Sequence, residues 1–220
     1  MAINRTEEYT EEADEFSSEA INARPRQSTS NDAIQSGWDA AEKLTRQPKT
    51  YAKEFRFSDT NLQIVKFLDE SGPFAVFRQH WLKKEGQKSY ICIGTNCPLC
   101  VTLGDRASDK RALSVANLSA EEGFQRQMLI ASPRIWTSLH GAHFSKNGPL
   151  TNNYWSLGKA GEAPATTFSV SPVKGRDLTE DWNINEAEAE AAIAEMKPFT
   201  RDDLRSASRE ELDAVADALL

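Results

Sequence analysis

Long apolar runs are missing from this sequence. No stretch approaches the roughly 18 consecutive apolar residues that a membrane-spanning helix requires. The N-terminus is rich in acidic side chains, among them Glu7, Glu8 and Glu11, whereas a secretory signal peptide begins with positive charge followed by an apolar segment. The sequence therefore predicts a soluble, cytoplasmic protein.

Cysteine is also scarce. The 220 residues include three cysteines, and an odd number would leave one thiol over in a disulfide framework. Two of the three stand as Cys97-Pro98-Leu99-Cys100, a spacing typical of metal or redox chemistry. A redox Cys-x-x-Cys belongs in a βαβ setting, and no such pattern surrounds this pair. The pair therefore indicates a metal site.

Motifs of catalysis are absent as well. The sequence has no glycine-rich phosphate loop, no serine nucleophile elbow and no paired-carboxylate motif. Zinc-dependent nucleobase deaminases share the Cys-x-x-Cys element, but they need a His-x-Glu proton shuttle. The corresponding residues here are His80-Trp81-Leu82. We therefore predict that the protein is not an enzyme.

Charge is unevenly distributed along the chain, whose net charge is -7. Residues 1–42 hold ten acidic and three basic side chains, residues 43–150 hold nine acidic and sixteen basic ones, and residues 181–220 hold eleven acidic and four basic ones. A basic centre between two acidic ends indicates a core that binds a polyanion, with arms that compete for it or recruit partners. Chance clustering on a solvated surface is the simpler alternative.

Three regions follow from this pattern. Residues 1–42 lack a sustained apolar period and are rich in Glu, Ser, Asn and Gln, which predicts a disordered acidic arm. Residues 43–180 form the expected core, which opens with a basic strip between Lys43 and Arg56. Residues 181–220 form an acidic helical tail.

Short strand-like runs dominate the core. β-branched and aromatic residues stand between turn signals such as Ser71-Gly72-Pro73 and Gly104-Asp105. Ser132 followed by Pro133 predicts one inserted helix that runs to about residue 143. This pattern favours a mainly β fold with added helices, and a small barrel over a sandwich. The expected strands are 62–68, 74–82, 87–93, 112–118, 127–131, 154–157 and 166–173.

The tail carries two helix signals. Asn185 caps a helix expected over residues 186–196, which Pro198 ends. Ser208-Arg209-Glu210-Glu211 is a capping box for a last helix. The apolar stripe of that helix is Leu212, Val215, Ala216 and Leu219. The stripe suits packing on its own domain and docking to a partner equally well.

The Cys97–Cys100 loop has the geometry of a zinc knuckle, in which a short turn directs both sulfurs toward one point. Pro98 stiffens that turn, and a third thiol, Cys92, lies five residues before Cys97. A tetrahedral site needs one more ligand.

His80 is the expected fourth ligand. Strands 74–82 and 87–93 form a hairpin around Glu85-Gly86, and a three-residue loop places His80 directly opposite Cys92. A two-residue loop would offset His80 by one residue, to the other face. We favour the first register because it brings nitrogen and sulfur to the same end of the sheet.

The result is a closed site that holds one structural Zn²⁺ per chain, because four protein ligands leave no position for a reactive water. Its metal ligands are His80, Cys92, Cys97 and Cys100. His140 or His143 could replace His80, since two histidines three apart on a helix also chelate metal.

Aromatic and basic residues alternate beside the expected metal site. Unpaired bases stack on aromatic rings while Lys and Arg follow the phosphates, so mixed aromatic and basic strands suit a single-stranded nucleic acid. The alternative is that Phe74, Phe77 and Trp81 belong to the core. The candidate nucleic-acid-binding residues are Arg56, Lys66, Phe77, Arg78, Trp81, Lys83, Lys84, Lys88, Tyr90, Lys110 and Arg111.

Two segments resemble the zinc-containing single-stranded DNA-binding proteins of tailed phages. The segments are Phe77-Arg78-Gln79-His80-Trp81 and Cys92-Ile93-Gly94-Thr95-Asn96-Cys97-Pro98-Leu99-Cys100. The resemblance implies an OB-fold core around a His, Cys, Cys-x-x-Cys zinc site, and an acidic tail that recruits replication and recombination proteins. The family's basic N-terminal arm is preceded here by the acidic residues 1–42, although residues 43–56 could substitute for it.

The sequence thus favours a protein that protects and organises single-stranded DNA in replication or recombination without sequence specificity. If a phage encodes it, the host cytoplasm is the expected location. The alternative is a zinc-ribbon accessory factor of transcription or recombination that acts through protein contacts. A metal-dependent nuclease is a third, weaker hypothesis.

Overall fold

The computed structural model describes residues 52–82, 88–162 and 165–220. The expected acidic arm over residues 1–42 and the basic strip as far as Tyr51 lie outside the described residues, as do Lys83 and Lys84. No helix in the described part of the chain is long and apolar enough to cross a membrane.

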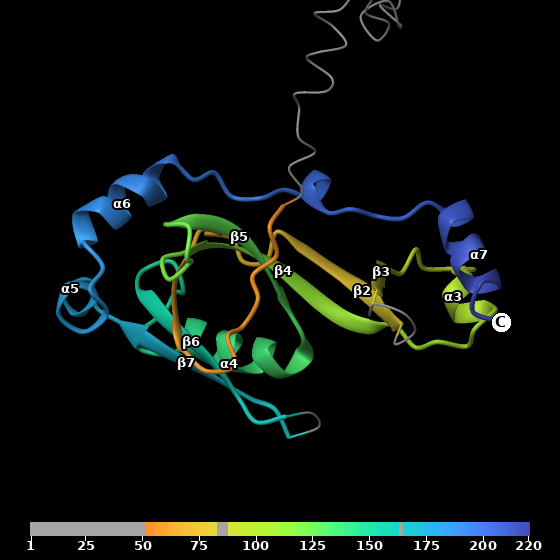
Figure 1. Ribbon diagram of the computed structural model, residues 1–220, viewed down its shortest axis with the longest axis horizontal. Coiled ribbons are helices and arrows are strands. Elements are labelled where there is room, and N and C mark those ends of the chain that lie inside the picture. The colour runs from red at the N-terminus through yellow and green to blue at the C-terminus, as the bar shows by residue number, and fades with distance from the viewer. Residues whose placement is uncertain (1–51, 83–87, 163–164) are drawn as a thin grey trace, which may run out of the picture. The chain divides into compact units, whose positions relative to one another are not determined.

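Each of the seven runs expected to be extended forms a strand, and the sheet that they build is antiparallel (Figure 1). The prediction of a β-rich fold with added helices is therefore confirmed. The strands are β1 (Gln63–Phe67), β2 (Ala75–Leu82), β3 (Lys88–Ile91), β4 (Ser108–Asn117), β5 (Gln125–Ala131), β6 (Tyr154–Ala160) and β7 (Thr167–Val173).

Strand β4 is the centre of the sheet. One of its edges pairs first with β2, where Phe77 faces Lys110, and then with β1, where Val65 faces Asn117. The other edge pairs with β5, where Leu113 faces Leu129. Strand β1 continues to β6, and β6 continues to β7.

The sheet is not closed into a barrel, so the expected OB-like barrel is not confirmed. Within the described residues β7 pairs with β6 alone. The edge of β5 that faces away from β4 is taken by residues 53–55 in a parallel bridge between Glu54 and Met128. Phe55 N–H donates to Met128 O at 2.8 Å, and Met128 N–H donates to Lys53 O at 2.8 Å.

The larger core lies on one face of the sheet, called the inner face. Side chains alternate along a strand, so Leu113 and Val115 of β4 point to this face and pack with Trp155 and Leu157 of β6. Helix α4 (Pro133–His143) covers them with Ile135 and Leu139. The helix begins at the proline that the sequence indicated.

The C-terminal segment covers the outer face. Helix α5 (Gly175–Trp182) and helix α6 (Glu186–Glu195) place Leu178 and Ala189 in a cluster with Ala116 of β4. Phe199 then packs on Ala112 and Met128, just before the 3-10 helix η2 (Arg201–Asp203). Figure 1 shows this segment running from α6 across the sheet toward the last helix. The acidic tail is therefore packed on the sheet.

One serine joins the tail to the gap between β1 and β2. Ser114 of β4 pairs with neither β1 nor β2, so its backbone groups bond to the residues that follow β1. The amide of Leu68 donates to Ser114 O at 3.0 Å. The carboxylate of Asp69 accepts from the Ser114 amide and, at 2.9 Å, from the Ser114 hydroxyl. Phe199 N–H donates to the same hydroxyl at 2.8 Å. Burial raises the pKa of Asp69, while the two hydrogen bonds from Ser114 act to lower it.

Two helices pack on each other beside the hairpin of β2 and β3. Helix α7 (Arg209–Asp217) has the expected capping box, because the Ser208 hydroxyl accepts from Glu211 N–H at 3.2 Å. Leu212 and Ala216 of α7 pack on Leu99 of the short helix α3 (Pro98–Val101). Of the two roles open for this apolar stripe, the structure shows packing on its own domain.

We expect Leu129→Ala to lower the free energy of unfolding by about 2–5 kcal/mol, because it leaves a cavity in the core under α4. Leu129 is 1% exposed, whereas Leu220 is 83% exposed, so Leu220→Ala is the matched control and should change stability little. Urea denaturation followed by circular dichroism measures both. Equal losses for the two variants would contradict this description of the core.

Candidate functional site

Four side chains converge between β2 and α3. The ligand atoms of His80, Cys92, Cys97 and Cys100 all lie within 4.8 Å of one another, close enough to bind one metal ion. The Cys92 and Cys100 sulfurs are 3.7 Å apart. The His80 Nε2 atom is 3.5 Å from the sulfur of Cys97 and 3.5 Å from that of Cys100.

The loop after β3 gives the cysteines their positions. Gly94 and Asn96 have φ angles of 86° and 60°, left-handed values that glycine and asparagine adopt most readily. The chain thereby turns back, and Cys97 N–H donates to Gly94 O at 3.2 Å. Helix α3 begins directly after Cys97, so its first turn carries Cys100 to the same side.

The hairpin register differs from the expected one. His80 is paired with Tyr90, and the amide of Cys92 donates to Arg78 O at 2.8 Å. The prediction that His80 lies directly opposite Cys92 is therefore wrong by two residues. Strand β2 extends to Leu82 and pairs there with Lys88, so the connection is longer than three residues. Because the shift is even, His80 and Cys92 still share one face.

Asp105 orients the histidine. Its Oδ2 atom lies 2.6 Å from His80 Nδ1, and the His80 side chain is fully buried. A carboxylate on one ring nitrogen fixes the tautomer and leaves the other nitrogen, Nε2, free to coordinate a metal. The Asp105 amide donates to Leu99 O at 3.0 Å, which anchors the carboxylate to the knuckle.

The thiols do not all ionise easily by themselves. Burial raises the pKa of Cys100 to about 11, and the neighbouring Cys92 and Cys97 add to the rise. Burial also acts to raise the pKa of Cys97, but backbone N–H groups and the His80 side chain stabilise the thiolate and hold its pKa at about 7. A cation bound between these sulfurs would stabilise their deprotonated forms.

Helix α7 packs beside the three cysteines. Leu212 and Ala216 form one buried cluster with Cys97 and Leu99, and Tyr90 packs against it. Neither this cover nor the Asp105 partner was predicted from the sequence. Both depend on contacts between distant segments, and the capping box at Ser208 signals a helix without saying where it packs.

His140 and His143 lie on α4, and neither belongs to the described group of metal-ligating side chains. They line a separate pocket with Trp136 and Phe144. The structure therefore assembles the ligand set with His80.

The candidate nucleic-acid-binding residues of β2 and β4 divide between two faces. Arg78 and Arg111 lie on the face of His80; Arg78 is exposed and reaches Ala107 O at 3.3 Å, and Arg111 is partly buried. Trp81 and Lys110 point to the opposite face, where Trp81 is 53% exposed. Phe77 lies on that second face and packs partly buried against the cluster around Phe199.

The other candidates are scattered. The Lys66 amine is 4.8 Å from the centre of the Tyr154 ring, on the side of α6, and burial lowers its pKa although Glu190 acts to raise it. Tyr90 packs against the buried cluster that contains Cys97 and Leu212, and Lys88 is the first residue of β3. The structure thus places Arg78 and Arg111 on the sheet face that carries His80, whereas Lys66 lies on the side of α6.

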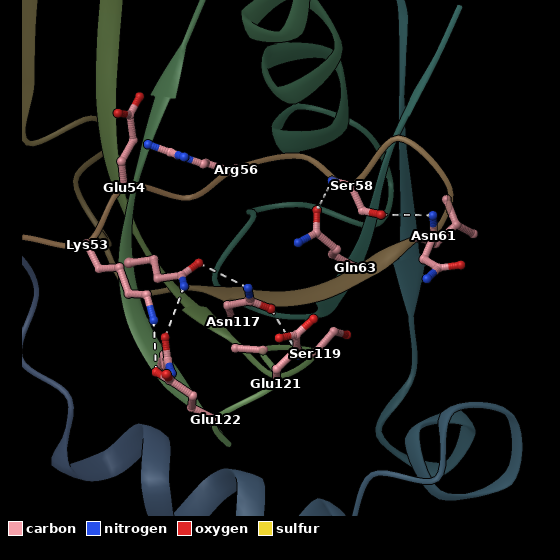
Figure 2. Close-up of a pocket in the computed structure, with 14 residues that line it drawn as sticks. Lys53, Glu54, Arg56, Ser58, Asn61, Gln63, Asn117, Ser119, Glu121 and Glu122 are labelled. Carbon is pink, nitrogen blue, oxygen red and sulfur yellow. Dashed lines mark hydrogen bonds and ion pairs between the residues drawn. The ribbon is translucent and has the colours of Figure 1, made fainter. Parts of the chain in front are cut away.

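Arg56 lines a separate polar pocket of about 730 Å³ (Figure 2). Two buried amides lie along it, with Asn117 donating to Gln127 at 3.0 Å. At its rim Lys53 donates to Glu122 at 3.0 Å. The described lining contains no aromatic side chain, so this pocket offers no surface on which bases could stack.

An aromatic row on α4 was not predicted. Trp136, His140 and Phe144 stand four residues apart, with ring centres 5.7 and 4.7 Å apart. The guanidinium of Arg111 lies 5.5 Å from the centre of the Trp136 ring. The signal in the sequence was the spacing of these three residues, because residues i and i+4 share one face of a helix.

Comparisons with known proteins identify no relative of this chain: no family model matches it, and no curated protein or solved structure matches it significantly.

We expect Leu212→Ala to destabilise the knuckle, because it removes a fully buried side chain that packs beside Cys97. Unfolding should become easier by about 2–5 kcal/mol, and in chelator-treated protein the thiols should react faster with a disulfide reagent. Asp217→Ala, an exposed change on the same helix, is the control. Unchanged thiol reactivity in Leu212→Ala would show that α7 does not shield the cluster.

Proposed function

We propose that this chain is a non-enzymatic, single-stranded DNA-binding protein whose core is stabilised by zinc and which protects DNA in replication or recombination. The observation that carries the proposal is the face shared by His80, Arg78 and Arg111. There Arg78, whose carbonyl accepts from the Cys92 amide, lies beside the metal ligands, and the guanidinium of Arg111 lies over Trp136 on the same face. Exposed Trp81 on the reverse of β2 adds an aromatic surface.

The donor set and its spacing support zinc. In a tetrahedron with Zn–S bonds of about 2.3 Å and a Zn–N bond of about 2.0–2.1 Å, sulfur atoms lie about 3.8 Å apart and nitrogen lies about 3.6 Å from sulfur. The corresponding distances here are 3.7 Å between sulfurs and 3.5 Å between nitrogen and sulfur. Four protein ligands leave no open position, so the metal has a structural role.

The order of the elements supports an OB-like core. An OB fold is a five-stranded, partly open Greek-key barrel. β1 with β2 would act as its interrupted first strand, followed by β4 and β5, then α4, β6 and β7. The hairpin of β2 and β3 and the knuckle would then be an elaboration between the first two strands. Such barrels commonly bind oligonucleotides on their strands and loops.

Single strands suit this surface better than duplexes. Guanidinium groups contact phosphates of either form, whereas aromatic side chains stack on bases that are unpaired. Duplex recognition commonly uses a helix that enters the major groove. Among the described residues, the helix nearest the metal ligands in sequence is α3, and it is four residues long.

The acidic tail supports a second role in recruiting replication or recombination proteins. Its buried side holds it on the sheet, while acidic side chains of α6 and α7 remain exposed, including Glu188, Glu190, Glu210 and Asp213. A basic surface of a partner could therefore bind the tail in its docked state.

One observation favours the alternative of a zinc-ribbon accessory factor that acts through protein contacts. Val101 is 71% exposed and Ile93 is 36% exposed, and both lie beside the knuckle. Filter binding with oligo-dT separates the two functions. The DNA-binding proposal requires salt-sensitive capture, and the alternative requires little or none.

Protein purified without chelator should contain one zinc ion per chain, and its cobalt-substituted form should show the absorption of a tetrahedral thiolate site. Cys97→Ser should unfold the core, because binding free energy at such a site is folding free energy. Asp105→Asn should weaken metal affinity by about 10- to 100-fold, measured by competition with a chromophoric chelator. The exposed change Asp109→Asn is its control. Absence of bound metal would refute the zinc assignment.

Binding should favour single-stranded over duplex DNA and should weaken as salt increases. Arg78→Ala should reduce the log–log salt slope by about 0.7, the value for one phosphate contact on a single strand. Arg176→Ala removes another exposed arginine, which lies on α5, and should leave the slope unchanged. Fluorescence anisotropy with labelled oligonucleotides measures these quantities. Equal affinity for duplexes and single strands would contradict the proposed function.

A further inference from the structure

The aromatic row on α4 borders a second pocket, of about 340 Å³. Trp136, His140 and Phe144 form one side of it, and Phe67 and Leu113 belong to its apolar lining. Two side chains of the row are open to solvent: Phe144 is 73% exposed, and His140 is exposed as well. Large exposed aromatic side chains beside a pocket mark a binding surface.

The polar lining of this pocket combines two carboxylates with Ser71 and two histidines. The carboxylates are those of Asp69 and Glu70, and the described lining contains no lysine or arginine. Phosphate is therefore repelled from the interior. A flat group that carries N–H donors is the complementary occupant, because it stacks on the aromatic row and donates to the carboxylates.

The basic groups lie outside the pocket, where a backbone would pass. The guanidinium of Arg111 lies over Trp136, and Arg111 is paired across the sheet with Val76, two residues from Arg78 on the same face. Phosphates at these two arginines and a base in the pocket are compatible with one strand of DNA.

We propose that this pocket takes one unpaired nucleobase that carries an amino group, stacked against the α4 row with its amino edge toward Asp69 and Glu70. This inference rests on the proposed single-stranded DNA binding and adds a base-selective subsite to it. Cytosine donates from its N4 amino group to a carboxylate. Thymine presents its one N–H between two carbonyl oxygens, which the carboxylates repel.

The test compares the full-length chain with a double variant, His140→Ala with Phe144→Ala, in anisotropy titrations with dC12 and dT12. Both side chains are exposed, so thermal melting should be unchanged. Loss of a stacking contact should weaken dC12 binding by about 5- to 150-fold and should remove a preference for dC12 over dT12. Leu220→Ala, which alters an exposed apolar residue outside α4, should bind like the unmodified chain.

The outcomes separate this inference from the proposed function. If the unmodified chain binds both oligonucleotides and the double variant binds dC12 equally well, the base subsite is refuted and DNA binding stands. Equal affinity of the unmodified chain for dC12 and dT12 would also refute an amino-bearing base in the pocket. If the unmodified chain binds neither oligonucleotide, both proposals fail.

Discussion

Strand β4 is hydrogen-bonded along both edges and covered on both faces. It pairs with β2 and β1 on one side and with β5 on the other, and the residues from Ala112 to Leu118 are buried. Its inner side chains pack under α4, and its outer side chains pack under α5, α6 and Phe199. Since burial of apolar area is the main favourable term in folding, the C-terminal segment is as much a part of this fold as the helix on the inner face.

The features that the sequence predicted well are those with local causes. Alternating side chains located the strands, Pro133 marked the start of α4, and the oxygen of Asn185 accepts hydrogen bonds from the first turn of α6 as its identity implied. The metal-ligand set could also be predicted from the sequence, because three of the ligands lie within nine residues. The alternation of side chains along a strand then indicated which face of the hairpin carries His80. The register of the hairpin could not be predicted, because the alternation of side chains fixes which face a residue lies on but does not distinguish registers that differ by two residues.

Contacts between distant segments account for what the sequence did not predict. The Asp105 partner of His80 and the cover of α7 join residues far apart in the chain. Acidic composition suggested a separate tail, yet buried apolar residues of the tail, Ala189 and Phe199 among them, pack it on the sheet. The same alternation that builds β2 also divides the basic residues, so that Arg78 and Arg111 share a face with the metal ligands while Lys110 does not. A linear pattern of aromatic and basic residues could not show this division.

Ser114 connects three parts of the chain through one hydroxyl, which donates to Asp69 and accepts from the amide of Phe199. Its backbone amide donates to the same carboxylate, which fills the gap left between β1 and β2. Positions 69 and 114 therefore constrain one another, and a side chain without a hydroxyl at 114 would leave the buried amide at 199 without its acceptor. We expect related chains to keep this serine or threonine wherever they keep the acid, and to lose the two together where the tail takes another course.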